Sequence, residues 1–279
     1  MNVFSTLTKG PFEITIDKFV DATHKKEPYF QVDATGKEKH YAICPECGNP
    51  IQIINLFGQE YEEQITKKRN THARHTGKDI KGLTKHNQKK YLDCPLHNVN
   101  SFSCKQLRND EIYNSNLLLL INKNTYKIIK DIREITGINF SNNYLEKMIN
   151  TYINSKNYSY SHTHRFNIPY SILYTSMSLD LYGRYLLINN CVSNEIERIV
   201  NCSANFEIKT MEDQNKNKII SKKIVKKSIR YFHLILQFSH HNIKAKTLRL
   251  SILEYEDNDI DNAVTLGSTT ITMNPFIYI

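Results

Sequence analysis

The stretch Cys44-Pro45-Glu46-Cys47-Gly48 decides the expected fold of the first part of the chain. Two thiols stand three positions apart, with proline after the first and glycine after the second. This spacing lets both sulfur atoms point at one ion from a tight turn, and glycine permits the backbone angles that such a turn needs. The stretch therefore predicts a zinc knuckle.

The residues around the knuckle have the alternating pattern of short strands. Segments 12–16, 29–32 and 40–43 precede it, and segment 51–56 follows it as a returning strand. A strand that runs directly into a pair of thiols and another that leaves it are typical of a zinc ribbon, whose thiols sit at hairpin tips. Gly48-Asn49-Pro50 argues against the helix start that a redox CxxC pair needs.

A structural zinc ion takes four ligands, mostly thiolate and imidazole. Cys94 begins a second stretch with the knuckle spacing, Cys94-Pro95-Leu96-His97, and is the third predicted ligand after Cys44 and Cys47. The fourth stays open among His75, His97 and His72. His75 is preferred because Thr76-Gly77 forms a turn that could aim its ring inward. A second site made of His72, His97 and Cys104 is a further alternative.

Segment 66–90 shows no apolar periodicity and is strongly basic. It holds nine Lys and Arg residues against one acid, Asp79, with three histidines interleaved. A loop of this length inside a compact domain is uncommon unless it is functional or held in place, and metal ligation would hold it. Dense cations beside a metal site can meet phosphates. The predicted nucleic-acid contacts are Lys67, Lys68, Arg69, Arg74, Lys78 and Lys81.

The CPECG stretch followed by His72-Ala73-Arg74-His75 resembles the N-terminal zinc-finger-like element of competence CoiA-like proteins. The resemblance covers residues 41–77. This chain has Ala73-Arg74 where the family prefers an aromatic and a small residue, and it carries a basic insertion. The resemblance implies DNA-related biology and would favour His72 and His75 together over Cys94. The nuclease-like domain that follows in the family has no convincing counterpart after residue 107.

The rest of the chain changes from a helical to a β pattern. Three helices are expected between 107 and 157: one from Asn109 or Asp110, one capped by Asn124 or Thr125 and ended by Gly137, and one capped by Ser141. From about residue 158, apolar runs between polar turns predict an antiparallel sandwich or small barrel. The predicted class is α+β, with a zinc-ribbon-like module over 1–106, a helical segment over 107–157 and a β-rich domain over 158–279.

Composition limits the class of protein further. The chain has 279 residues and a formal charge of +9, which favours anionic partners. Six cysteines are too few for a disulfide framework and fit a reducing cytoplasm. Cys191 and Cys202 fall in a strand-like region and are predicted to be buried free thiols. The N-terminus lacks a secretory apolar region, and the longest apolar run, 117–121, is too short to cross a bilayer, so no membrane partner is expected.

A second basic run covers 216–230 and is followed by Tyr231-Phe232-His233. Aromatic rings beside cations on a sheet could stack bases. Lysines also protect exposed edge strands, and a solvated hairpin is the interpretation that we adopt from the sequence.

Three functions remain open. The first is a nucleic-acid-binding protein with structural zinc and no catalytic residues. The second is an interaction protein in a complex, in which zinc is purely structural. The third is a metal-dependent nuclease, for which Asp180 and Glu207-Ile208-Lys209 loosely match an Asp…Glu-x-Lys arrangement that binds magnesium.

Overall fold

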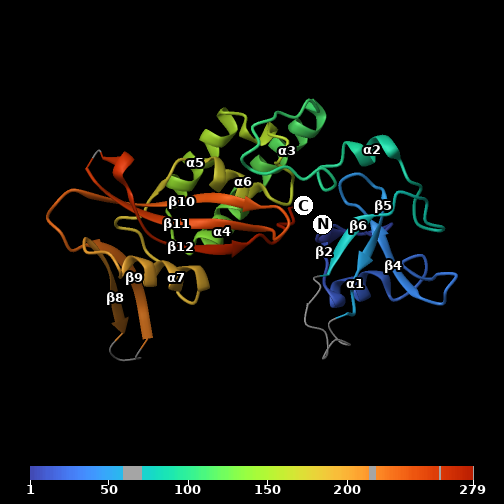
Figure 1. The fold of residues 1–279 in the computed structure, drawn as a ribbon, viewed down its shortest axis with the longest axis horizontal. Helices are drawn as coiled ribbons and strands as arrows, with labels where there is room; N and C mark the ends of the chain where they lie inside the picture. The colour runs from blue at the N-terminus through green and yellow to red at the C-terminus, as the bar shows by residue number, and fades with distance from the viewer. Residues whose placement is uncertain (59–70, 214–217, 258, 279) are drawn as a thin grey trace. The chain divides into compact units, whose positions relative to one another are not determined.

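The structure is a computed structural model that describes residues 1–58, 71–213, 218–257 and 259–278 (Figure 1). The chain divides into two compact units, Met1–Val99 and Asn100–Ile279, termed the N-terminal and the C-terminal unit. Helices and antiparallel strands both occur, which confirms the α+β class. Within the described ranges, every helix is too short or too polar to cross a membrane.

A four-stranded antiparallel sheet in the order β3-β4-β5-β6 forms the frame of the N-terminal unit. Its strands are β3 (Phe30–Val32), β4 (Glu38–Ile43), β5 (Pro50–Ile54) and β6 (His72–His75). A second, two-stranded sheet pairs β1 (Val3–Phe4) with β2 (Phe12–Glu13). The strands predicted at 29–32, 40–43 and 51–56 are therefore confirmed, and the knuckle is the turn between β4 and β5.

Two predictions for this unit were wrong in part. The strand expected over 12–16 is only β2, because the Thr15 side chain accepts the Lys18 N–H (3.2 Å) and starts α1 (Ile16–Thr23). Segment 66–90, expected as a loop, contains β6 and the start of α2 (Gln88–Leu92). β6 has no apolar periodicity of its own, and its pairing with β5 supplies the hydrogen bonds that make it a strand. Phe19 of α1 packs against Phe4, with ring centroids 5.1 Å apart.

The three predicted helices of the C-terminal unit are confirmed as α3 (Glu111–Lys123), α4 (Thr125–Thr136) and α5 (Asn142–Asn154). Asp110 caps α3 by accepting the Tyr113 N–H (2.9 Å), and Ser141 caps α5 by accepting the Tyr144 N–H (3.3 Å). Gly137 ends α4 in the left-handed region, at φ 67°. A 3-10 turn at Asn157–Ser159 follows α5.

Two further helices lie where strands were predicted. α6 (Ile168–Thr175) is buried on all sides over its first six residues, so it has no polar face whose period could reveal a helix. α7 (Cys191–Val200) begins where the Asn190 side chain accepts the Val192 and Ser193 N–H groups. Cys191 and Cys202, expected as buried thiols in a strand, are instead exposed near the two ends of α7.

The strands of the C-terminal unit form two antiparallel sheets (Figure 1). β7 (Leu179–Asp180), β10 (Phe232–Asn242), β11 (Thr247–Glu256) and β12 (Val264–Thr272) lie in the order β12-β11-β10-β7, and a 3-10 turn at Ile260–Asn262 precedes β12. β8 (Phe206–Asp213) and β9 (Lys218–Lys226) form a hairpin. Segment 183–186 pairs with β9 through Gly183 N–H to Ile224 O (3.0 Å) and Leu186 N–H to Lys222 O (2.9 Å).

One hydrophobic core joins these helices and strands. It includes Ile129 of α4, Ile149 of α5, Ile172 of α6, Leu236 of β10 and Ile252 of β11, all nearly or fully buried. The helical segment 107–157 therefore shares its core with the strands. The predicted sandwich or barrel is not confirmed, because no sheet among the described residues closes and helices supply the facing layer of this core.

Candidate metal centre

Three separate parts of the N-terminal unit bring four ligand groups together. Cys44 and Cys47 lie in the turn between β4 and β5, His75 is the last residue of β6, and Cys94 follows α2. Their ligand atoms all lie within 4.8 Å of one another, so this group could hold a metal ion. Among the described residues it is the one such group of His, Cys, Asp or Glu side chains.

Backbone hydrogen bonds fix the turn that carries the first two thiols. The Cys44 N–H donates to Asn49 O (2.8 Å), and the Gly48 N–H donates to Cys44 O (2.9 Å). Gly48 has φ 71°, in the left-handed region that glycine enters without the steric cost of a side chain. Cys44 is buried, and Cys47 stays partly accessible.

Two pairs among the four groups lie within hydrogen-bond distance. Cys44 Sγ lies 3.7 Å from Cys94 Sγ, and Cys47 Sγ lies 3.2 Å from His75 Nε2. Contacts with Cys44 and Cys94 hold the pKa of the Cys47 thiol far below its usual range. Contacts with Cys47 and Cys94, together with burial, raise the pKa of Cys44 well above its usual range.

Cys94 also holds its proton in this arrangement. Its contact with Cys44 lowers its pKa, but the contact with Cys47 and burial outweigh that effect and raise the pKa to about 12. One thiolate, Cys47, is thus stabilised by two neighbouring thiols. A metal ion must displace the protons of Cys44 and Cys94 to bind all three sulfur atoms, so metal binding releases protons.

Asn49 is a residue of the site that the sequence analysis did not identify. It is 1% exposed, and its Nδ2 donates to Cys47 Sγ (3.3 Å) and to Asn87 O (3.1 Å). Its Oδ1 accepts the Asn87 N–H (2.6 Å), which ties the knuckle to the start of α2. No sequence signal marked it, because asparagine after glycine is also an ordinary turn residue.

The alternative histidines do not join the group. His72 lies on β6 three positions before His75, and side chains three apart on a strand point to opposite faces. His97 is exposed, and its ring lies tilted against Tyr91 at 3.8 Å between centroids, with the His75 ring 5.7 Å away. Burial, and then the nearby His75, lower the pKa of His97. Cys104 belongs to the C-terminal unit, and no metal-holding group among the described residues includes it.

The predicted nucleic-acid contacts are placed in part. Arg74, Lys78 and Lys81 are exposed, and none of them forms an ion pair with a described carboxylate. Arg74 Nη2 reaches Gln52 Oε1 at 3.4 Å. Lys67, Lys68 and Arg69 lie outside the described residues.

The residues of the nuclease hypothesis are not brought into one site. Asp180 lies on β7, in the four-stranded sheet of the C-terminal unit, whereas Glu207 and Lys209 lie on β8 of the hairpin. Glu207 faces Val225 across the hairpin, and Lys209 faces Lys223. No metal-holding group among the described residues contains any of them.

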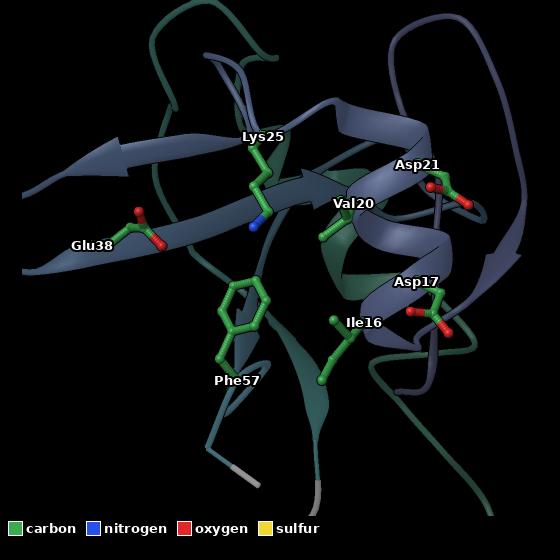
Figure 2. Close-up of a pocket in the computed structure, with 7 residues that line it drawn as sticks. All are labelled: Ile16, Asp17, Val20, Asp21, Lys25, Glu38 and Phe57. Carbon is green, nitrogen blue, oxygen red and sulfur yellow. The ribbon is translucent and has the colours of Figure 1, made fainter. Parts of the chain in front are cut away.

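A hollow in the N-terminal unit lies between α1, β4 and Phe57 (Figure 2). The Lys25 ammonium lies 5.7 Å from the centroid of the Phe57 ring. Three carboxylates against one ammonium disfavour an anion there. The metal-holding group takes no part in its lining, which consists of Ile16, Asp17, Val20, Asp21, Lys25, Glu38 and Phe57.

Comparisons of the chain with protein-family models, curated proteins and solved structures found no match. The function is therefore argued from the site itself.

Proposed function

We propose that the N-terminal unit is a structural zinc module that presents the basic segment 66–90 to nucleic-acid phosphates. The observation that carries this proposal is the grouping of Cys44, Cys47, His75 and Cys94. His75 and Cys94 bracket most of the described part of the basic segment. An ion bound to both would close residues 76–93 into a loop and restrict the positions of its cations.

The donor set and its spacing fit zinc. Three thiolates and one imidazole are a common set of ligands in structural zinc sites. A tetrahedron with Zn–S bonds of about 2.3 Å has S···S edges of about 3.8 Å, and Cys44 and Cys94 are 3.7 Å apart. The Cys47–His75 separation of 3.2 Å is shorter than the S···N edge of about 3.6 Å, so these two groups would move apart slightly on binding.

Four protein ligands would leave no open position on a tetrahedral ion. Catalytic zinc sites keep one position for water or substrate, so this set favours a structural role. Bound zinc would stabilise the folded N-terminal unit, because a site assembled from three chain segments does not exist in the unfolded chain.

The charge of the loop closed by His75 and Cys94 favours an anionic partner. Its described cations are all exposed, and its acids are Asp79 and Asp93. Neutralising phosphates with such cations releases counterions and gives salt-dependent binding. The resemblance to CoiA-like proteins points toward the same class of ligand. The cations are Lys78, Lys81, Lys85, Lys89 and Lys90.

Metal content is the first test. Protein purified without added zinc should contain about one equivalent of zinc per chain, measured by inductively coupled plasma mass spectrometry. Less than half an equivalent in a folded protein would refute the zinc site.

Charge reversal is the second test. We expect the quadruple variant Arg74→Glu, Lys78→Glu, Lys81→Glu, Lys85→Glu to bind labelled DNA and RNA at least about 10-fold more weakly and with a smaller salt dependence. The control reverses exposed lysines of the C-terminal unit and changes the net charge equally: Lys105, Lys123, Lys130 and Lys147. Equal losses in both variants would show a net-charge effect only. A zinc-loaded wild type that binds no nucleic acid would leave the interaction protein as the function.

A further inference from the structure

The C-terminal unit carries an exposed group of aromatic and cationic side chains where β9 ends and β10 begins. The Lys226 ammonium lies between two tyrosine rings, 4.9 Å from the centroid of Tyr182 and 4.6 Å from that of Tyr231. Tyr182 lies in the turn after β7, and Tyr231 immediately precedes β10. We refer to Tyr182, Lys226 and Tyr231 as the tyrosine–lysine surface.

Both rings remain open to a ligand. Tyr182 is 50% exposed and Tyr231 is 67% exposed, although each also contacts Lys226. Ile229, in the turn between the two strands, is fully exposed. A group of exposed apolar and aromatic side chains often marks a binding surface, whereas a single exposed one does not.

The aromatic row continues along the outer face of the larger sheet. The Tyr231 ring meets His233 edge-on at 5.9 Å, and His233 stacks on Tyr255 at 4.9 Å with an interplanar angle of 19°. His233 and Tyr255 are register partners on β10 and β11. Leu234, the next residue on β10, is fully buried on the opposite face, so the row lies on the side away from the core.

Lys226 is the cation at the centre of the surface, between the two rings. Lys227 and Arg230 are exposed in the turn beside Lys226. Acidic residues also adjoin the surface: Asp180 Oδ1 accepts the Tyr182 N–H (3.2 Å), and the Asp257 N–H donates to Tyr231 O (2.7 Å). Glu256 is exposed and lies opposite Phe232 in the register of β10 and β11. Lys226 forms no ion pair with any described carboxylate, so its ammonium remains available to a ligand.

We propose that the tyrosine–lysine surface binds single-stranded nucleic acid, with bases stacked on Tyr182 and Tyr231 and a phosphate at Lys226. A single strand offers free base faces and phosphates in alternation, which matches rings that flank a cation. In a duplex the bases are already stacked on one another. A protein partner would favour a continuous apolar patch, whereas here the Lys226 ammonium separates the Tyr182 and Tyr231 rings. The inference goes beyond the proposed function, because none of these residues belongs to the N-terminal unit.

A matched control exists on the same hairpin. The Lys223 ammonium lies 5.3 Å from the centroid of Tyr185, which is 42% exposed. Lys223 is three positions before Lys226 on β9 and so points to the other face. Removal of the Tyr185 ring therefore removes a similar tyrosine–lysine pair without touching the proposed surface.

The test uses fluorescence anisotropy to measure how the zinc-loaded 279-residue chain binds labelled 20-nucleotide dT and rU strands and a duplex of equal length. We expect Tyr182→Leu and Tyr231→Leu each to weaken single-strand binding by about 5- to 100-fold. Duplex binding of these two leucine variants should stay within about 2-fold of wild type, because the bases of a duplex are already stacked. Single-strand binding of Tyr231→Phe and Tyr185→Leu should also stay within about 2-fold, because neither variant removes a ring from the proposed surface. Comparison of dT with rU shows whether the strand is DNA or RNA, and melting curves confirm that the variants fold.

Three results would overturn the inference: single-strand affinity unchanged in both leucine variants, equal losses on duplex and single strand, or an equal loss in Tyr185→Leu. Charge reversal at Arg74, Lys78, Lys81 and Lys85 separates this failure from that of the proposed function. If that reversal weakens binding and the leucine variants do not, only the present inference fails. If the wild type binds neither strand nor duplex, both fail.

Discussion

His75 is the residue that connects the knuckle to the basic segment. It lies opposite Ile51 in the register of β5 and β6, and Ile51 is fully buried. Its side chain therefore lies on the inner face of the sheet, whereas His72 lies on the outer face. Because β6 is extended, the two imidazoles of the HxxH stretch cannot reach one ion together, and Cys94 takes the place that His72 would have had.

This difference predicts unequal effects of the two histidines. His75→Ala should weaken zinc binding on the order of 100-fold, because one of four ligands to an ion held by about 10–16 kcal/mol is lost. His72→Ala should leave zinc affinity within about 2-fold of wild type. Competition with a chromophoric chelator measures both. Equal losses in the two variants would contradict the assignment of His75 as the ligand.

Asn49 contacts the candidate metal site through Cys47. Its buried amide donates to the sulfur atom and at the same time closes both hydrogen bonds with the Asn87 backbone. Such partners orient the ligand and stabilise its charged form, and their loss commonly lowers metal affinity 10- to 100-fold.

We therefore expect Asn49→Ala to lower zinc affinity by about 10- to 100-fold in the same chelator competition. Asn87→Ala is the control. It removes the Asn87 side chain, which caps α2 by accepting the Lys90 N–H (3.0 Å), and it leaves the backbone bonds to Asn49 in place. It should cost about 1 kcal/mol of stability and change zinc affinity little. A stronger effect of Asn87→Ala on zinc would contradict the role of Asn49.

At the scale of elements, the end of α4 depends on one glycine. Gly137 has φ 67°, and a Cβ there would lie 2.6 Å from the Ser193 backbone nitrogen at the start of α7. The Gly137 carbonyl also accepts the Ser193 hydroxyl (2.6 Å) and the Leu187 N–H (2.9 Å). The close approach of α4 and α7 therefore requires the absence of a side chain.

Gly137→Ala should destabilise the C-terminal unit more than Gly183→Ala. Gly183 has a similar φ of 75°, but a Cβ there would meet nothing within 4 Å. Gly183→Ala should cost only the left-handed strain, about 1–2 kcal/mol, and Gly137→Ala should add the clash with α7. Urea unfolding measures both free energies. Equal costs would show that the backbone around Ser193 yields without penalty.

The sequence could predict α3, α4 and α5 because their ends are marked by local chemistry. Asp110, Ser141 and Gly137 form caps that need no distant partner. β6 and α6 could not be predicted in the same way. The first depends on pairing with β5, and the second is apolar on all sides, so neither has a period of its own.

The same distinction applies to the candidate site. The spacing of Cys44 and Cys47 is local and pointed to a metal from the sequence alone. The choice of His75 over His72 depends on the strand character of β6, and the role of Asn49 depends on where α2 begins. Both follow from pairings between distant segments, which spacing along the chain does not reveal.

At the scale of the whole molecule, the proposed zinc site would stabilise one unit and not the other. The C-terminal unit buries a continuous core built from five helices and most of its strands. The N-terminal unit buries apolar side chains of its own, among them Phe4, Phe19 and Ile51, and a metal ion would add a cross-link between its segments. Zinc at the proposed site would supply that cross-link.

Removal of zinc should therefore affect the two units unequally. After dialysis against a strong chelator, hydrogen exchange should accelerate in β4, β5 and β6 and remain slow in β10 and β11. Restoring one equivalent of zinc should restore protection, because binding energy at such a site is folding energy. Uniform acceleration in both units, or none in the N-terminal unit, would contradict this division.

Acid should weaken zinc binding in the N-terminal unit and should also destabilise the C-terminal unit, there through a group of histidines. The His241 ring stacks on Phe102 at 4.2 Å, and its Nδ1 accepts the Phe102 N–H (3.1 Å). His162 Nδ1 bonds to Cys104 O (2.9 Å). Burial, then the nearby His162, lowers the pKa of His241 to about 4, and burial, then Arg108, lowers the pKa of His164 to about 3. Burial also lowers the pKa of His162.

The pKa values of these histidines in the folded protein lie below the value of about 6.5 in the unfolded chain. At a pH between the folded and the unfolded pKa, the unfolded chain therefore binds more protons than the folded one. Stability is therefore complete above about pH 6.5 and falls as the pH drops toward 4. Buried His164 should cost up to about 2 kcal/mol between pH 7 and pH 5, and His241 somewhat less because it is partly solvated. Urea unfolding of the C-terminal unit at the two pH values measures the loss.

His241→Gln keeps an acceptor for the Phe102 N–H but cannot titrate, so it should reduce the loss of stability at low pH. His240→Gln, at an exposed neighbour, should not reduce it. An unchanged pH dependence in His241→Gln would show that the burial of this imidazole does not govern acid sensitivity.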